Sequence, residues 1–167
     1  MAQQRSIALI GFMGSGKTTV GRLVSNELQI TFRDLDAETE NMAGMRIPVL
    51  ADTQGELALR TYETLALTRV CPEGGVLATS SGCVMLQRNI HILKSAYFNI
   101  FLDAPIDILL ERVAGTSRPI LKSMSHDELR RLYELRKPQY LDCASVTLDA
   151  TLPVKALTDR IIDIYYS

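Results

Sequence analysis

"SIALIGFMGSGKTTVGRL", residues 6–23, is the stretch that decides the fold of this 167-residue chain. Its apolar start is typical of a buried strand, and its end repeats apolar side chains at helical spacing. Between them, the residues from Gly11 to Thr18 match the pattern G-x-x-x-x-G-K-[ST]. A strand, a glycine-rich loop and a helix in this order predict a loop that binds the phosphates of a nucleotide.

The loop itself supplies three kinds of phosphate contact. Backbone N–H groups from about Gly14 to Thr19 can point at a polyphosphate, and the dipole of the following helix favours the negative charge. The Lys17 ammonium can neutralise the β and γ phosphates, and the Thr18 hydroxyl can hold Mg²⁺. The expected nucleotide-binding residues of the loop are Gly14, Ser15, Gly16, Lys17, Thr18 and Thr19. The alternative, a glycine-rich turn with a helix-capping threonine, leaves the lysine unexplained.

Length and composition indicate one domain, residues 1–167, because 47% hydrophobic residues are enough for one buried core. A net charge of −1 offers no basic field for a nucleic acid or an anionic membrane, so we expect neither as a partner. The apolar run at residues 7–10 is too short to cross a bilayer, and the polar opening "MAQQRS" is not a secretion signal. We expect a cytoplasmic monomer.

Cysteine and histidine usage argues against a metal centre that these two residue types would hold. Cys71, Cys83 and Cys143 are odd in number and lack C-x-x-C spacing, so we expect reduced structural thiols. Only two histidines occur in the chain, too few for a typical His-ligated site.

Strand-length apolar runs alternate along the chain with segments of helical period, which predicts an α/β fold with a parallel sheet covered on both faces. Ligands bind such a sheet at the carboxyl ends of its strands. The expected strands are 6–10, 29–33, 75–79, 97–102 and 145–149. The expected helices are 16–28, 36–43, 47–53, 56–70, 86–95, 105–114, 126–142 and 153–166.

Local signals support several of these boundaries. Ser125 and Glu128 form a capping-box pattern, and Gly44 and Gly55 occur where helices would end. The segment "GTSRPILKSM", residues 115–124, has no apolar period and joins two helical stretches. We therefore interpret it as a mobile lid.

Two acidic residues follow the second predicted strand in "FRDLDAE". Asp34 and Asp36 are two positions apart, which places them on the same side of an extended chain. A metal–nucleotide kinase can use one carboxylate to hold a metal-bound water and the other to orient a hydroxyl and take its proton. The alternative for Asp36 is the N-cap of the following helix.

Three arginines lie in segments next to loops: Arg60 in "GELALRTYE", Arg118 in the predicted lid and Arg136 in "LRKPQY". Guanidinium groups suit carboxylate and phosphate oxygens, so the set indicates a small anionic substrate. For each arginine alone, the alternative is a solvated helix face or an ion pair.

The segments "GFMGSGKTT", "FRDLD", "GELALRTYE", "RPIL" and "LRKPQY" occur in the order, and at close to the spacing, found in shikimate kinase. The resemblance covers almost the whole chain. It implies a three-layer P-loop fold like that of nucleoside monophosphate kinases, with a five-stranded parallel sheet in the order 2-3-1-4-5. It also implies a short lid at about 112–125, a substrate-binding helical region at about 34–62, and Mg²⁺-dependent transfer of the ATP γ-phosphate to the 3-hydroxyl of shikimate.

The resemblance also assigns roles to individual residues. Asp34 would hold the water shell of Mg²⁺ with Thr18, and Asp36 would bind the shikimate hydroxyls and act as a base or orienting group. The substrate-binding set implied is Asp36, Arg60, Gly82 and Arg136, with the two arginines on the shikimate carboxylate. The catalytic set implied is Lys17, Asp36 and Arg118. Arg112 and Pro153 fall where the family contacts adenine.

The chain departs from the family after its third strand, where three consecutive glycines are usual and this sequence has Ser80, Ser81 and Gly82. If either serine needs a positive φ, strain of about 1 kcal/mol is expected. In one interpretation both serines keep ordinary backbone angles and their hydroxyls replace water near the γ-phosphate or the substrate ring. In the other, the protein phosphorylates another small hydroxy acid, or binds ATP without turnover. We expect an active enzyme, since every ionic role is filled.

Overall fold

A five-stranded parallel sheet in the order β2-β3-β1-β4-β5 forms the centre of the computed structural model, which describes residues 6–116 and 119–167. The strands are β1 (Ile7–Ile10), β2 (Phe32–Asp34), β3 (Val76–Ala78), β4 (Phe98–Asp103) and β5 (Val146–Asp149). All four pairings are parallel, with Ile7 of β1 between Val76 and Phe98. The strand order and direction expected from the sequence are confirmed.

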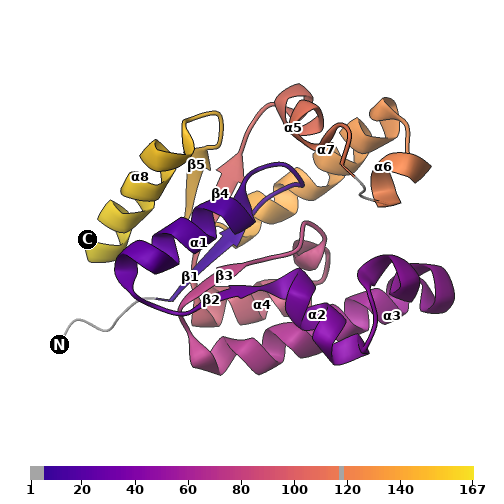
Figure 1. The fold of residues 1–167 in the computed structure, drawn as a ribbon, viewed down its shortest axis with the longest axis horizontal. Helices are drawn as coiled ribbons and strands as arrows, with labels where there is room; N and C mark the ends of the chain where they lie inside the picture. The colour runs from indigo at the N-terminus through magenta and orange to yellow at the C-terminus, as the bar shows by residue number, and fades with distance from the viewer. Residues whose placement is uncertain (1–5, 117–118) are drawn as a thin grey trace.

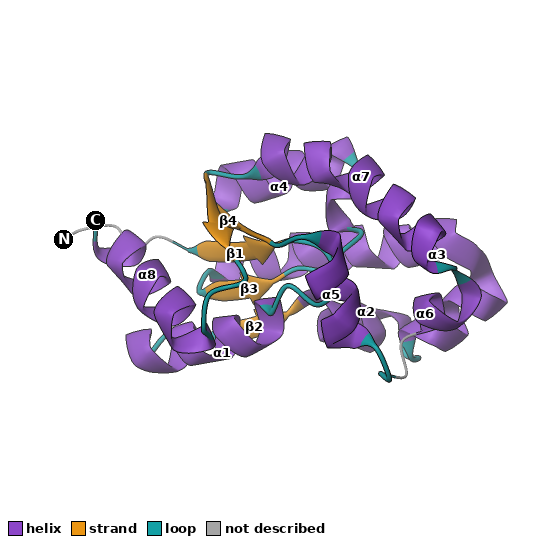
Figure 2. Ribbon diagram, turned by 90° about the horizontal axis from the view of Figure 1, so that it is seen from above, coloured by secondary structure: helices purple, strands orange, loops and turns teal. Residues whose placement is uncertain are grey.

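Helices cover both faces of this sheet (Figure 1). They are α1 (Lys17–Leu28), α2 (Leu35–Ala43), α3 (Ile47–Val70), α4 (Gln87–Ala96), α5 (Ile106–Val113), α6 (Pro119–Ser123), α7 (His126–Cys143) and α8 (Val154–Tyr166). Short 3₁₀ turns lie at η1 (Cys71–Glu73) and η2 (Cys83–Met85). Figure 2 shows α1 and α8 on one face and α4 and α7 on the other. In the described part of the chain, no helix combines the length and the apolar character needed to span a membrane.

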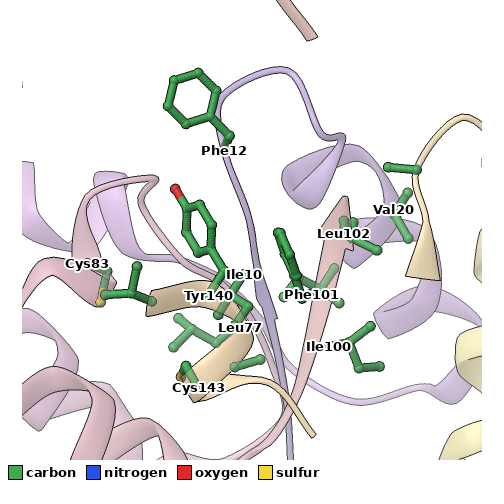
Figure 3. Packing of buried hydrophobic residues seen from close by; sticks show 14 of the residues in the cluster. Ile10, Phe12, Val20, Leu77, Cys83, Ile100, Phe101, Leu102, Tyr140 and Cys143 are labelled. Atoms are coloured by element: carbon green, nitrogen blue, oxygen red, sulfur yellow. The ribbon is translucent and has the colours of Figure 1, made fainter. Parts of the chain in front are cut away.

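The core lies where the central strands meet the helix layers. All four residues of β1 are buried, as expected for a central parallel strand that is covered on both faces. On one side of the sheet, Phe101 of β4 stacks on Tyr140 of α7 with the ring centroids 5.0 Å apart. In Figure 3 the Tyr140 hydroxyl points out of this packing, toward Phe12. The core therefore extends up to the loop that follows β1.

Helix ends follow the signals in the sequence. Gly44 ends α2 with φ 67°, and Ser125 and Glu128 form the predicted capping box at the start of α7. The expected helices 47–53 and 56–70 are the two halves of α3, which bends at Gly55 (φ 84°, ψ 173°). The three cysteines are free thiols, as expected.

The start of the second strand was predicted three residues too early. Gln29 takes a left-handed conformation (φ 54°) that closes α1, and the Ile30 N–H still bonds to the Ser25 carbonyl. The chain becomes a strand only at Phe32, so β2 extends to Asp34. The expectation that residues 115–124 lack regular structure is also wrong in part, because α6 occupies Pro119–Ser123.

Truncating Leu102, the next-to-last residue of β4, tests the importance of this core. Leu102 is 0% exposed, so Leu102→Ala removes buried contacts and leaves a cavity. We expect a loss of about 3 kcal/mol in the free energy of unfolding. The control is Leu57→Ala, since Leu57 is 82% exposed and its truncation should change stability by less than about 0.5 kcal/mol. Urea denaturation measures both values, and equal losses would contradict the assignment of the core.

Candidate active site

The loop between β1 and α1 is packed against α5 and folded around its own lysine. Gly14 has φ 80°, and a Cβ there would lie 2.6 Å from the Leu109 carbonyl oxygen of α5, so only glycine fits. The Lys17 Nζ donates to the carbonyl oxygens of Gly11 at 2.8 Å and Phe12 at 3.0 Å. The first N–H groups of α1 have no acceptor within the helix and are available to an anion at its start.

Thr18 and Asp34 meet beside this loop. The Thr18 hydroxyl donates to Asp34 Oδ2 at 2.8 Å, and Asp34 Oδ1 accepts from the Asp36 N–H at 3.0 Å. A hydroxyl and a carboxylate are the oxygen donors that Mg²⁺ prefers, and this ion usually keeps several waters and few protein ligands. The donor set therefore fits the predicted magnesium site.

The predicted geometry of the acidic pair is wrong. Asp34 ends β2 and is itself the N-cap of α2, where its side chain accepts the Asp36 and Ala37 N–H groups. Asp36 is the second residue of α2 and its side chain is exposed. The two acids therefore do not share one side of an extended chain, and Asp36 is not the N-cap, because the strand ends two residues before it.

Arg60 of α3 lies directly against Gly82, which follows β3. A Cβ at residue 82 would be 2.4 Å from both the Nη1 and Nη2 atoms of Arg60, so a side chain there would displace the guanidinium. Arg60 also pairs with Glu63 at 2.9 Å and with Glu56 at 2.7 Å. Burial lowers the pKa of Arg60, but the two carboxylates outweigh burial and the pKa is raised. Neither glutamate was predicted as a partner of Arg60, although spacings of three and four residues on one helix are the signal for such ion pairs.

Arg136 of α7 is only 6% exposed and carries a charge that the protein does not neutralise fully. Its Nη1 donates to Ser81 Oγ at 3.0 Å, while its buried Nε has no hydrogen-bond partner in residues 6–116 and 119–167. Burial lowers the pKa of Arg136, and the nearby Arg60 charge lowers it further. A desolvated guanidinium with an unused donor is a strong site for an anion.

Ser80 and Ser81 carry no backbone strain, since Gln29 is the only non-glycine residue with positive φ among the described residues. The first interpretation of the serines is therefore right about the backbone. Their hydroxyls bond to protein side chains, since Ser80 donates to the Glu63 carboxylate and Ser81 accepts from Arg136.

The predicted acceptor residues come together around residues 80–83, at the carboxyl end of β3. Burial raises the pKa of the Cys83 thiol well above its ordinary value, and the charges of Glu63 and Asp36 add to this effect. Residues from α3 and α7 meet at this segment, and Arg60 brings two acidic groups, Glu56 and Glu63, with it. The position of Asp36 in the acceptor site stays a prediction.

The remaining predicted residues lie on the nucleotide side or outside the described chain. Arg112 of α5 donates to the Gly14 carbonyl at 3.3 Å and to the Ala150 carbonyl at 2.8 Å. Pro153, the exposed N-cap of α8, lies three residues beyond Ala150. Arg112 thus joins the phosphate loop to the segment that contains Pro153. Arg118 lies outside the described residues, and α6 begins just after it.

Sequence comparison identifies close relatives. The shikimate kinase family model matches residues 13–165. The shikimate kinase of Clostridium beijerinckii is 40% identical over 142 residues, which cover 84% of this chain and 83% of that protein. The shikimate kinase of Enterococcus faecalis is 38% identical over 149 residues, 87% of this chain and 89% of that protein.

Structural comparison agrees with the sequence relatives. The shikimate kinase from Acinetobacter baumannii in complex with shikimate superposes with a TM-score of 0.92 at 32% identity, and covers 97% of this chain and 93% of that one. The deoxyadenosine kinase from M. mycoides with bound dATP has a TM-score of 0.62 at 16% identity, with 97% of this chain and 100% of that one covered. This more distant likeness shows a shared P-loop kinase fold.

Replacing Arg60 and replacing Arg136 should change the free energy of unfolding by different amounts. Arg60→Met leaves Glu63 buried without its cation, so we expect the free energy of unfolding to fall by about 3 kcal/mol. Arg136→Met replaces an incompletely paired buried charge with an apolar chain, so we expect a change of less than about 1 kcal/mol or a gain. Denaturant unfolding of the ligand-free protein measures both. A loss for Arg136→Met as large as that for Arg60→Met would contradict this account.

Proposed function

This chain belongs to the shikimate kinase family, and on that premise we propose which of its residues bind shikimate, hold ATP and assist phosphoryl transfer. The protein is an ATP-dependent kinase that converts shikimate to shikimate 3-phosphate and releases ADP, in the pathway to aromatic amino acids. The family match supports this function over the two alternatives considered from the sequence, a kinase for another small hydroxy acid and an ATP-binding module without turnover.

The residue assignment rests on two arginines, Arg60 and Arg136, whose guanidinium groups lie beside residues 81–82. Arg60 lies on Gly82 and Arg136 bonds to Ser81, so both guanidinium groups lie beside one short segment. Like charges this close repel each other, and an anion between them removes the repulsion. A single carboxylate can accept from both groups, so Arg60 and Arg136 bind the shikimate carboxylate, and Gly82 keeps the space open.

Asp36 holds the acceptor hydroxyl. It starts α2 next to Asp34, close to the phosphate loop through the Thr18–Asp34 hydrogen bond. In the reaction, the 3-hydroxyl oxygen forms a bond to the γ-phosphorus as the bond from that phosphorus to the bridging oxygen of ADP breaks. The hydroxyl proton passes to the Asp36 carboxylate, which acts as orienting group and base.

The nucleotide lies on the phosphate loop. Phosphate oxygens replace the loop carbonyls as partners of the Lys17 ammonium and accept N–H groups from Gly14, Ser15, Gly16 and Thr19. Thr18 and Asp34 would hold Mg²⁺, Asp34 through water, and the ion would supply positive charge to the β and γ phosphates. Arg112 and Pro153 contact the adenine.

Segments further from the phosphates complete the proposal. Residues 112–125 act as a lid that brings Arg118 to the transferring phosphate and excludes water, which would otherwise accept the phosphoryl group. Residues 34–62 form the acceptor-binding region of a single domain. A monomeric state and a cytoplasmic location, proposed from composition and charge, stay predictions.

Acceptor-dependent release of ADP tests the function directly. With saturating Mg²⁺ and ATP, we expect shikimate to stimulate ADP release by at least about 100-fold, because water is a poor competitor when the site is closed. Lys17→Met provides the background and should abolish the stimulated rate. Stimulation only by a different polyol acid, or tight ATP binding with no release in any mixture, would refute the shikimate kinase assignment.

Asp36→Asn tests the role of the acidic residue in transfer. The amide keeps the shape of the side chain but cannot take a proton, so we expect kcat to fall by about 100-fold or more. ATP affinity should change little, since Asp36 is assigned to the acceptor hydroxyl and not to the phosphates. Steady-state kinetics and nucleotide titration measure the two quantities, with Glu27→Gln on the exposed side of α1 as the matched control. A near-normal kcat would remove Asp36 from the role of base.

A further inference from the structure

Two serine hydroxyls bond to the side chains of the acceptor site. Ser81 bonds to Arg136, and Ser80 bonds to Glu63, the partner of Arg60. Ser80 and Ser81 follow β3 after one intervening residue, Thr79, and Ser80 is buried. We propose that Ser80 and Ser81 are positioning residues, which hold Arg60 and Arg136 in place before the acceptor binds and so tighten shikimate binding. The proposal rests on the proposed function of these arginines.

Ser81 fixes Arg136 directly. Its Oγ accepts from Arg136 Nη1 at 3.0 Å, and its carbonyl oxygen accepts from the Tyr140 hydroxyl at 2.5 Å. Arg136 and Tyr140 are four residues apart on α7, so one helix face contacts both polar groups of Ser81. Nη1 is therefore held by the hydroxyl before a ligand binds, while the buried Nε has no hydrogen-bond partner among the described residues.

Ser80 acts on Arg60 through Glu63. The Glu63 carboxylate, whose side chain is only 3% exposed, accepts from Arg60 Nη1 at both oxygens, at 3.0 and 2.9 Å. The Ser80 hydroxyl donates to Glu63 Oε1. A buried carboxylate needs several donors to stay in one position. Ser80 thus supplies a second protein donor, and fixing Glu63 also fixes the guanidinium that it binds.

The third position of the segment has the opposite requirement. A Cβ at Gly82 would lie 2.4 Å from two nitrogens of Arg60, so any side chain there would displace the guanidinium. Ser80 and Ser81 have no positive φ and their hydroxyls have partners. Serine is therefore suited to the first two positions, whereas at the third it would move Arg60.

Positioning of this kind changes affinity because arginine is a flexible side chain. A guanidinium that is already ordered loses less conformational entropy when it binds a carboxylate. With glycine at residues 80 and 81, both hydroxyls would be absent, and Arg136 and Glu63 would each lose a partner. The serines should therefore improve shikimate binding relative to glycine and leave the chemical step unchanged.

The test compares Ser80→Ala, Ser81→Ala and the double variant with glycine at both positions. Hydrogen bonds to charged groups are strong, so each alanine should raise the Kd and KM for shikimate about tenfold, which corresponds to ~1.4 kcal/mol. We expect kcat within about twofold of wild type and an unchanged KM for ATP, since no nucleotide contact is lost. The double glycine variant should bind shikimate more weakly than either alanine variant.

Alanine and glycine separate the hydroxyl from the Cβ, because alanine keeps the Cβ. Unchanged shikimate affinity in both alanine variants, or tighter binding by the double glycine variant, would overturn the proposal. Ser25→Ala is the matched control, since Ser25 is also buried and its hydroxyl bonds only to the Arg22 carbonyl among the described residues. Should Ser81→Ala fail to unfold cooperatively in urea, Ser81→Gly takes its place, since it removes the same hydroxyl together with the Cβ.

Crystal structures of the ligand-free variants separate this proposal from the assignment of the substrate. Without the hydroxyls, the Arg136 guanidinium and the Glu63 carboxylate should move or become disordered. Groups that stay in place in Ser80→Ala and Ser81→Ala would refute positioning, whichever acceptor the enzyme uses. If wild type fails to bind shikimate while the side chains do move, the proposed function fails and the positioning role is supported.

Discussion

The placement of two guanidinium groups side by side, away from water, is the constraint on which the rest of the acceptor site depends. Arg60 has Glu56 and Glu63 as partners, and Arg136 has a serine hydroxyl and an unused donor. The protein therefore neutralises the charge of Arg60 with two carboxylates and neutralises the charge of Arg136 only in part. An acceptor that carries a carboxylate supplies the missing charge, which links substrate recognition to the electrostatics of the empty site.

The phosphate loop and the acceptor helix are in physical contact through Phe12. The Phe12 ring lies edge-on to Tyr133 with centroids 5.5 Å apart, and the Arg136 guanidinium lies 5.9 Å from its centroid. Tyr133 donates to Asp103 at the end of β4, where Lys137 also binds. A residue of the nucleotide loop thus packs against two residues of α7. This packing fixes the loop relative to the helix that carries Arg136, which suits an in-line transfer between substrates bound on either side.

Much of the fold could be predicted from the sequence, because apolar runs and helical periods alternate regularly and the loop motif has a required context. The parallel pairing followed from this alternation, and the order of the strands came from the family resemblance. The start of β2 could not be read from the pattern, since Gln29 and Ile30 look like strand residues but close α1. Asp36 was misplaced for another reason: β2 ends at Asp34 and α2 begins at Leu35, one residue before the predicted helix. The bond between Ser80 and Glu63 depends on contact between α3 and the segment after β3, and no local pattern reports such a contact.

Cys83 adjoins the acceptor site, and its burial has a consequence for the chemistry that the enzyme tolerates. A thiol reacts with oxidants and alkylating agents as the thiolate, and the raised pKa of Cys83 suppresses that form. Cys143 is also buried, with its pKa raised to about 11, and Cys71 is the partly exposed thiol, in η1 at the opposite end of β3. Oxidative damage should therefore begin at Cys71, far along the strand from the shikimate-binding groups, and catalysis should outlast the first modified cysteine.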